Sequence, residues 1–130
     1  MLGRVSDATL HAWYEAATLF VHPTLYEGSS LVTLEAMAHR RPVVATRAGG
    51  LPDKVVPGET GWLVSPGDAE ALADALAEAL ALSATDGLAK MGAAGRELVE
   101  RSFSWDAVTD RLLALYAEVL GQRADPASRG

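Results

Sequence analysis

The sequence predicts an α/β fold, an incomplete doubly wound (Rossmann-like) parallel sheet of about three strands flanked by helices. Three short segments, 18–21, 42–46 and 62–64, are rich in aliphatic residues and show no apolar–polar alternation, which is typical of strands buried on both faces. They alternate with helical segments, as in strand–helix–strand units. Because three strands make a small sheet, we interpret the chain as half of a doubly wound domain.

The first helix is expected over 7–17. Ser6 is a suitable N-cap, and one face of the segment is apolar: Leu10, Trp13, Tyr14 and Ala17. The apolar run at 18–21 follows and is stopped by Pro23, which suits a short buried strand.

A loop over 24–30 leads to a second helix over 30–39, most of whose residues are apolar. This helix ends in the one tight basic cluster of the chain, His39, Arg40 and Arg41. We interpret the cluster as a helix C-terminus whose positive charges complement the helix dipole, rather than as a binding patch. The second strand, 42–46, follows directly.

The second strand is followed by Gly49 and Gly50, where the backbone must turn tightly or approach another group closely. One helical turn is expected within 51–56 and a reverse turn within 57–61, before the third strand.

Three helices are expected to complete the chain. The first covers 69–82 after Pro66-Gly67-Asp68 and carries Leu72, Leu76 and Leu80 on one face. The next covers 86–101 and is expected to be broken or weakened near Gly92 and Gly95. The last covers 105–120 behind Ser104, with an apolar stripe that we interpret as a core face anchored by its first member: Trp105, Val108, Leu112, Leu115 and Val119.

The chain has 130 residues, and we expect one partial domain over 1–120 and a loose polar tail over 121–130. A net charge of −6 argues against broad binding to nucleic acid or anionic membranes. The absence of cysteine excludes disulfides and thiolate metal sites. There is no recognisable signal peptide and no apolar run near the roughly 18 residues that span a bilayer. We therefore expect a cytoplasmic protein, with peripheral membrane association open to a full-length form.

Two glutamates, Glu27 and Glu35, flank the start of the second helix with seven residues between them. Ligands of open parallel sheets bind at the carboxyl ends of strands, where the loop over 24–30 begins. Glu35, one turn into the helix, could accept hydrogen bonds from two neighbouring ribose hydroxyls. Glu27 could hold hydroxyls of a second ring or stabilise positive charge developing on a sugar. Either glutamate could instead be only a dipole or capping partner.

The start of the same helix is suited to phosphate. Gly28 permits close backbone approach, while Ser29 and Ser30 can cap the helix or donate hydroxyls. The free backbone N–H groups of Ser30, Leu31 and Val32 would point into the crevice. Hydrogen-bond donors for a phosphate, next to carboxylates that could bind sugar hydroxyls, predict a nucleotide-sugar site.

An ordered set of motifs surrounds these residues: P-T-L-Y-E-G-S-S-L-V-T-L-E-A-M-A-H-R-R-P-V-V-A-T, then G-G-L-P-D, then G-E-T-G-W-L-V-S-P-G-D. The set resembles the C-terminal, donor-binding part of retaining family 4 (group 1) glycosyltransferases, whose GT-B architecture has two Rossmann-like domains. The similarity covers about residues 2–120. Its ends are Leu2-Gly3-Arg4-Val5-Ser6 and Phe103-Ser104-Trp105.

The resemblance implies a role for each glutamate. Glu27 matches the first glutamate of the family, near the donor sugar hydroxyls and the reacting carbon, and is the catalytic candidate. Glu35 matches the second, which binds the nucleotide ribose. Backbone N–H groups of Gly28, Ser29, Ser30 and Leu31 would contact the diphosphate, and the further candidates are Tyr26, Gly49 and Gly50. No metal or other cofactor is expected, since the nucleotide-diphosphate sugar is itself the substrate.

The resemblance also implies what residues 1–130 lack. The basic residues that clamp the diphosphate belong to earlier strands of the family, and the acceptor site belongs to an N-terminal domain. The chain alone is therefore expected to bind donor rather than to turn it over.

Four residues at three places depart from the family pattern. Ser29-Ser30 stand where Phe-Gly is common, which alters the fit around the sugar. Arg40 replaces a frequent helix-ending glycine, so a left-handed residue there would carry a side-chain cost. Asp53 replaces a longer Glu.

Other interpretations remain open for several polar residues. His11 and His22 could be metal ligands or bases, although without a second cluster at ligand spacing a core or surface role is favoured. Arg47, Asp53 and Lys54 are interpreted as solvated loop charges, with Arg47 able to reach a phosphate.

Two further functions remain open for the chain as a whole. It could be a non-catalytic module that forms a homodimer or binds another chain through an exposed sheet edge. It could also be part of a nucleotide-sugar epimerase on the same two-domain architecture.

Overall fold

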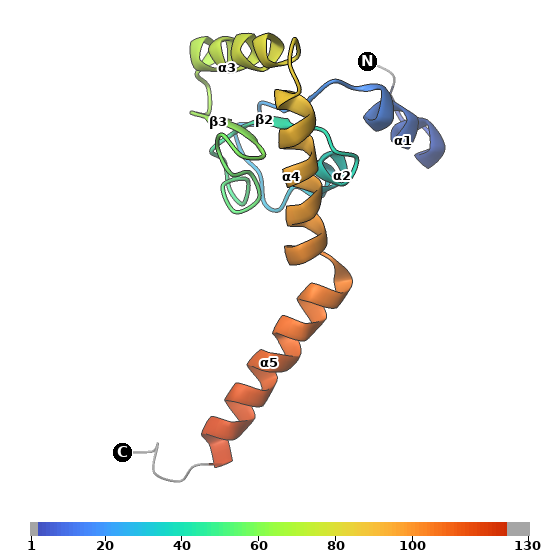
Figure 1. Cartoon of the computed structure of the whole chain (residues 1–130). Coiled ribbons are helices and arrows are strands. Elements are labelled where there is room, and N and C mark those ends of the chain that lie inside the picture. Colours follow the sequence, from blue (N-terminus) through green and yellow to red (C-terminus); the bar gives the residue numbers. More distant parts are fainter. Residues whose placement is uncertain (1–2, 125–130) are drawn as a thin grey trace.

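The computed structural model describes residues 3–124. Its elements follow the expected order (Figure 1): α1 (Asp7–Ala16), β1 (Phe20–His22), α2 (Leu31–Ala38), β2 (Val43–Thr46), β3 (Gly61–Val64), α3 (Ala69–Leu82), α4 (Gly87–Ser102) and α5 (Trp105–Ala124). Residues 1, 2 and 125–130, including most of the expected tail, lie outside the described residues.

The three strands form one parallel sheet in the order β1-β2-β3. Val43 of β2 is the register partner of both Phe20 of β1 and Gly61 of β3. All four residues of β2 are buried, as expected for a central parallel strand. The predicted α/β class and parallel sheet are confirmed.

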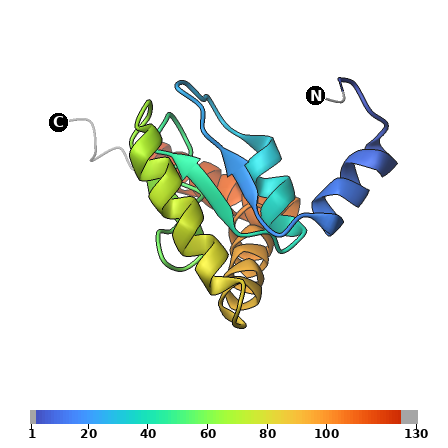
Figure 2. The ribbon, with the colours of Figure 1, turned by 90° about the horizontal axis from the view of Figure 1, so that it is seen from above.

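Helices cover both faces of the sheet (Figure 2). On one face, α2, α4 and the segment after β2 enclose a core that includes Met37, Val43 and Leu51, each fully buried. On the other, α3 and the start of α4 pack on Val44 and Trp62. Consecutive residues of β2 thus point into opposite cores, because side chains alternate along a strand.

Helix α4 continues through Gly92 and Gly95, so the expected break there is wrong. A Cβ on Gly92 would lie 2.2 Å from the carbonyl oxygen of Arg40, and one on Gly95 would lie 3.7 Å from Met37. Close approach of α4 to the end of α2 therefore accounts for glycine at 92, and the packing outweighs the low helix propensity of the residue.

The C-terminus of α2 closes with Arg40 in the left-handed region, at φ 57°. The Arg40 and Arg41 N–H groups donate to the Met37 and Ala36 carbonyls at 2.9 Å each, the bond pattern of a Schellman motif. The guanidinium of Arg41 donates to the His39 and Ala17 carbonyls, and that of Arg96 to the Ala38 carbonyl. The basic cluster is a helix C-terminus, as predicted.

The apolar stripe of α5 is not a core face, so its interpretation was wrong, whereas Leu72 and Leu76 of α3 pack against the core. Trp105 is 87% exposed, and the rest of its stripe is exposed too: Val108, Leu112, Leu115 and Val119. Helix α5 projects away from the sheet beyond α4 (Figure 1), so no residue within 3–124 covers this face. Three apolar side chains of α1 and α3 are exposed as well: Leu10, Trp13 and Leu80. Helix α5 also extends to Ala124, four residues past its expected end at 120.

We predict that Arg40→Gly raises the free energy of unfolding by about 1 kcal/mol, because glycine adopts the left-handed conformation without the Cβ penalty. Urea unfolding followed by circular dichroism measures the change. The matched control is Arg40→Ala, which removes the guanidinium but keeps Cβ and should give no gain. Equal gains from both variants would place the cost in the side chain and contradict the backbone argument.

Candidate functional site

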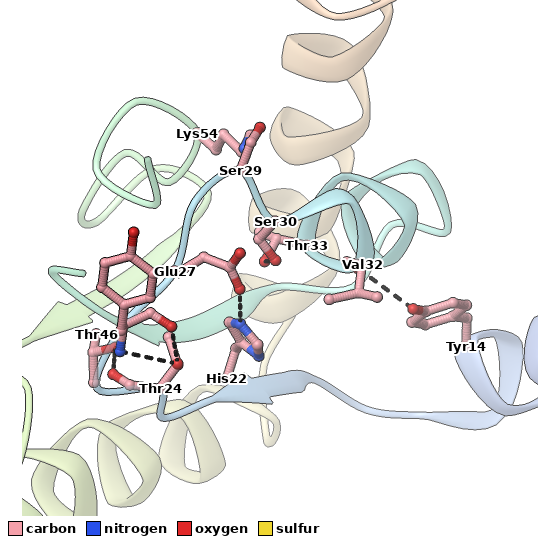
Figure 3. Close-up of polar contacts among 11 residues, drawn as sticks. Tyr14, His22, Thr24, Glu27, Ser29, Ser30, Val32, Thr33, Thr46 and Lys54 are labelled. Carbon is pink, nitrogen blue, oxygen red and sulfur yellow. Dashed lines mark hydrogen bonds and ion pairs between the residues drawn. The ribbon is translucent and has the colours of Figure 1, made fainter. Parts of the chain in front are cut away.

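The loop over 23–30 lies at the carboxyl end of β1, the end at which open parallel sheets bind ligands. Its first turn is held locally: the Thr24 hydroxyl donates to the Tyr26 carbonyl at 2.7 Å (Figure 3). The Thr46 hydroxyl, at the end of β2, donates to the Thr24 carbonyl. The loop is thereby tied to both neighbouring strands.

Gly49 and Gly50, which follow β2, press against the middle of this loop. Gly49 has φ 51°, and a Cβ there would lie 1.4 Å from the carbonyl oxygen of Glu27. The Gly50 N–H donates to the Gly28 carbonyl at 3.1 Å, and a Cβ on Gly50 would lie 2.8 Å from the same oxygen. Close approach of two loops is therefore the reason for both glycines.

Glu27 points back toward the sheet rather than into solvent. Its Oε2 lies 2.9 Å from Nε2 of His22, the last residue of β1 (Figure 3). The two side chains are 22% and 23% exposed, so one carboxylate oxygen is held while the group remains partly accessible. His22 is thus the partner of Glu27, and among residues 3–124 no group of three His, Cys, Asp or Glu could hold a metal ion.

The N-terminus of α2 lacks a side-chain cap. Ser30 occupies the N-cap position, but its hydroxyl lies 2.8 Å from the Thr33 hydroxyl instead of accepting from a backbone N–H. The first backbone N–H groups of a helix have no partner within the helix, so those of this first turn are left without either kind of acceptor. Such a terminus is favourable for an anion.

Lys54 is buried, so its interpretation as a solvated charge was wrong; Arg47 and Asp53 are exposed as expected. Only 4% of Lys54 is accessible, and its ammonium donates to the Ser29 hydroxyl at 2.9 Å (Figure 3). It forms no ion pair with any described carboxylate. The lysine instead fills space under the loop, next to the Gly28–Gly50 contact.

Glu35, in the second turn of α2, is held by a residue from α1. The Tyr14 hydroxyl donates to its Oε2 at 3.0 Å and lies 3.4 Å from the Val32 carbonyl. Burial, followed by the hydrogen bond and the charge of Glu35, raises the pKa of Tyr14 to about 12. Tyr14 therefore remains protonated, and a donor, throughout the physiological range.

The Tyr14 ring also stacks on His39, with centroids 5.4 Å apart and planes inclined by 17°. His39 Nε2 lies 2.8 Å from Nδ1 of His11. Both histidines thus join α1 to the end of α2, which agrees with a structural role for His11.

Comparison with known proteins identifies the family. The family model described as "Glycosyl transferases group 1" matches residues 1–81. The chain belongs to the group 1 glycosyl transferases. A curated relative, the MMP alpha-(1->4)-mannosyltransferase of Mycolicibacterium hassiacum, is 38% identical over 121 residues, which are 92% of this chain and 29% of that protein.

Solved structures of glycosyltransferases share the fold. Sucrose-phosphate synthase from Thermosynechococcus elongatus is 40% identical with a TM-score of 0.79, over 92% of this chain and 30% of that one. The C-terminal domain of a group 1 family protein from Francisella tularensis is 33% identical with a TM-score of 0.68, over 80% and 53%.

Anabaena HepE has been solved in complex with UDP and with UDP-glucose. In the UDP complex it is 28% identical to this chain with a TM-score of 0.66, over 85% of this chain and 29% of that one. The UDP-glucose complex is 29% identical with a TM-score of 0.61 over the same shares.

This group 1 chain spans about 30% of the length of the mannosyltransferase and of the sucrose-phosphate synthase named above. It matches the C-terminal part of a GT-B enzyme. None of its helices in 3–124 is both long and apolar enough to cross a membrane.

The sequence indicated both glutamates as site residues but not the side chains that hold them. Tyr14 was placed only in an apolar stripe; its polar tip was the signal that could have indicated a partner.

We predict that Lys54→Ala lowers the free energy of unfolding by about 2–3 kcal/mol, because it removes a buried stem and leaves a cavity. Lys54→Met keeps most of the volume and should cost about 1 kcal/mol. The control is Lys90→Ala, which removes an exposed ion pair with Asp86 and should change stability by roughly 0.5 kcal/mol or less. Urea unfolding measures all three. Equal effects of Lys54→Ala and Lys90→Ala would mean that Lys54 is solvated.

Proposed function

We propose that the chain is the donor-binding part of a retaining glycosyltransferase, which binds a nucleotide-diphosphate sugar for transfer to an acceptor. One observation carries the proposal: the uncapped N-terminus of α2 lies between two carboxylates, Glu27 in the loop before it and Glu35 in its second turn. Family membership and the UDP and UDP-glucose complexes of a similar structure support this use of the site.

Each part of the site has a distinct task in the proposal. Backbone N–H groups from Gly28 to Leu31 receive the diphosphate, where the helix dipole favours negative charge. Glu35 accepts hydrogen bonds from the ribose hydroxyls through the part of its carboxylate that Tyr14 leaves free. The part of the Glu27 carboxylate that His22 leaves free is placed beside the donor sugar, where a carboxylate stabilises positive charge as the bond from the sugar to the diphosphate breaks.

Tyr26, Gly49 and Gly50 line the same end of the sheet. Tyr26 is 87% exposed and could contact a ligand, whereas the two glycines act first by holding the loop. In transfer, the sugar carbon loses its bond to the diphosphate and gains one to an acceptor oxygen on the same face. The diphosphate leaves with the bonding electrons and takes up the proton that the acceptor hydroxyl loses.

Turnover in the proposal needs groups beyond this chain. The relatives are more than three times as long as the part matched here, and an N-terminal domain would bring the acceptor and further cations for the diphosphate. We propose that these cations and the N–H groups of α2 do the work of charge neutralisation without a metal ion.

The binding step is testable on the 130-residue chain. Titration with UDP, GDP or ADP, or their sugar conjugates, should shift backbone amide NMR signals of residues 28–31. Glu35→Gln should weaken binding about tenfold, because a hydrogen bond to a charged group contributes at least about 1.5 kcal/mol. The control is Glu78→Gln, an exposed carboxylate on α3. Absence of shifts with all these ligands would refute the proposal, and unchanged affinity in Glu35→Gln would refute the ribose role.

A second candidate, a self-associating module, is favoured by a separate observation. The exposed apolar stripe of α5 and the open edge of β1 are both unpartnered within residues 3–124. Exposed apolar faces and open edges are sites of association. This function would need neither a donor nor an acceptor.

Sedimentation equilibrium distinguishes the second candidate. Association through α5 predicts a concentration-dependent dimer that Leu112→Glu and Leu115→Glu together convert to monomer, because buried charges oppose an apolar interface. Thr109→Glu adds charge at an exposed position outside the stripe and should leave the dimer intact. A parent that remains monomeric at high concentration would rule this candidate out.

A further inference from the structure

We propose that Tyr14 is a positioning residue for Glu35, so that helix α1 contributes to ribose recognition. The inference rests on the proposed function and extends it to a residue and an element outside the loop and helix that contact the donor. Glu35 would recognise the cis-diol of the ribose, and Tyr14, by positioning Glu35, would determine the preference for ribonucleotides over deoxyribonucleotides.

The geometry of Tyr14 is that of a fixed donor. It is the one buried residue of α1 among those described, with 6% of its surface accessible. Its hydroxyl reaches 3.0 Å from Glu35 Oε2 across a sequence separation of 21 residues. The second acceptor within reach is the Val32 carbonyl at 3.4 Å, one turn before Glu35 on the same helix (Figure 3). The hydroxyl is thus directed at α2 whichever acceptor it favours.

The ring that carries this hydroxyl is held in place. His39 stacks on it from the end of α2, and His11 of α1 bonds to His39. The Phe20 ring of β1 lies 6.0 Å away. A phenol fixed by contacts from α1, α2 and β1 can orient a flexible carboxylate, whereas a solvated partner could not.

The consequence for Glu35 follows from its oxygens. A carboxylate has about four acceptor positions on two oxygens, and Tyr14 occupies one of them on Oε2. Glu35 is only half-buried, and its hydrogen bond to Tyr14 engages Oε2 and not Oε1. Without the phenol, the side chain would sample several rotamers and would have to be ordered on binding, at a cost in affinity for the diol.

The experiment compares ribose recognition in the parent and in Tyr14→Phe. Affinities for UDP and 2′-deoxy-UDP are measured by NMR titration of the 130-residue chain. The parent should prefer UDP about tenfold, the equivalent of one hydrogen bond to a charged group. Tyr14→Phe should reduce that preference to about threefold or less through weaker UDP binding, with the affinity for 2′-deoxy-UDP nearly unchanged. Tyr116→Phe, an exposed tyrosine of α5, is the matched control and should behave as the parent.

The possible results distinguish a failure of the Tyr14 inference from a failure of the proposed donor binding. Equal loss of affinity for both nucleotides would mean that Tyr14 only stabilises the fold, and tighter UDP binding would mean that it competes with ribose; each result overturns the inference alone. A parent that binds neither nucleotide overturns the proposed function and the inference with it.

If Tyr14→Phe does not fold, 3-fluorotyrosine at position 14 keeps the ring and changes the acidity of the hydroxyl. The ratio of the two affinities must then shift, and an unchanged ratio overturns the inference.

Discussion

The site depends on one constraint, the contact between the loop after β1 and the loop after β2. Gly49 adopts φ 51° with no room for a Cβ beside the Glu27 carbonyl, and Gly50 bonds to the Gly28 carbonyl. Any other residue at 49 would combine a backbone penalty with a collision against main-chain atoms that cannot move aside. Because this contact fixes the backbone at Glu27 and Gly28, it also fixes where α2 begins and where its free N–H groups lie. The buried ammonium of Lys54 bonds to the next residue, Ser29, and supports the same segment from below.

The two ends of α2 differ in how their backbone polar groups are hydrogen-bonded. At the C-terminus the carbonyls are bonded by backbone N–H groups of Arg40 and Arg41 and by the guanidinium groups of Arg41 and Arg96, and Gly92 lets α4 lie against the turn. At the N-terminus no side chain caps the helix, although Ser30 occupies the capping position. A helix end costs free energy when its polar groups lack partners, so the uncapped end is tolerable only because it faces solvent or a ligand. The carbonyls at the C-terminus of α2 are therefore bonded, whereas its N-terminus has no side-chain cap at the place where the donor is proposed to bind.

The sequence predicted the parallel sheet and the loop at the carboxyl end of its first strand because both depend on local order. Short aliphatic runs identified the strands, and the loop containing Glu27 had to leave the carboxyl end of the first strand. It did not predict what depends on contacts between distant segments. Periodicity identified an apolar face on α5 but could not show whether anything covers it, and Trp105 is exposed. Helix propensity argued for a break at Gly92, where packing on Arg40 decides instead. Lys54 is buried and bonds to Ser29, a residue 25 positions away in the sequence, and local sequence carries no signal for such a contact.

The partners of the two glutamates explain why their spacing alone is a weak signal. Seven intervening residues place both near the start of α2, but neither carboxylate is oriented by that helix. Glu27 is held by His22 from the end of β1, and Glu35 by Tyr14 from α1. A carboxylate on a flexible side chain recognises a hydroxyl well only when its rotamer is fixed before binding. Two glutamates at this spacing without such partners would present the same charges in many arrangements. In the proposed function, binding of a sugar nucleotide therefore depends on how β1 and α1 pack around α2, and it involves residues that lie up to 21 positions from the glutamates they orient.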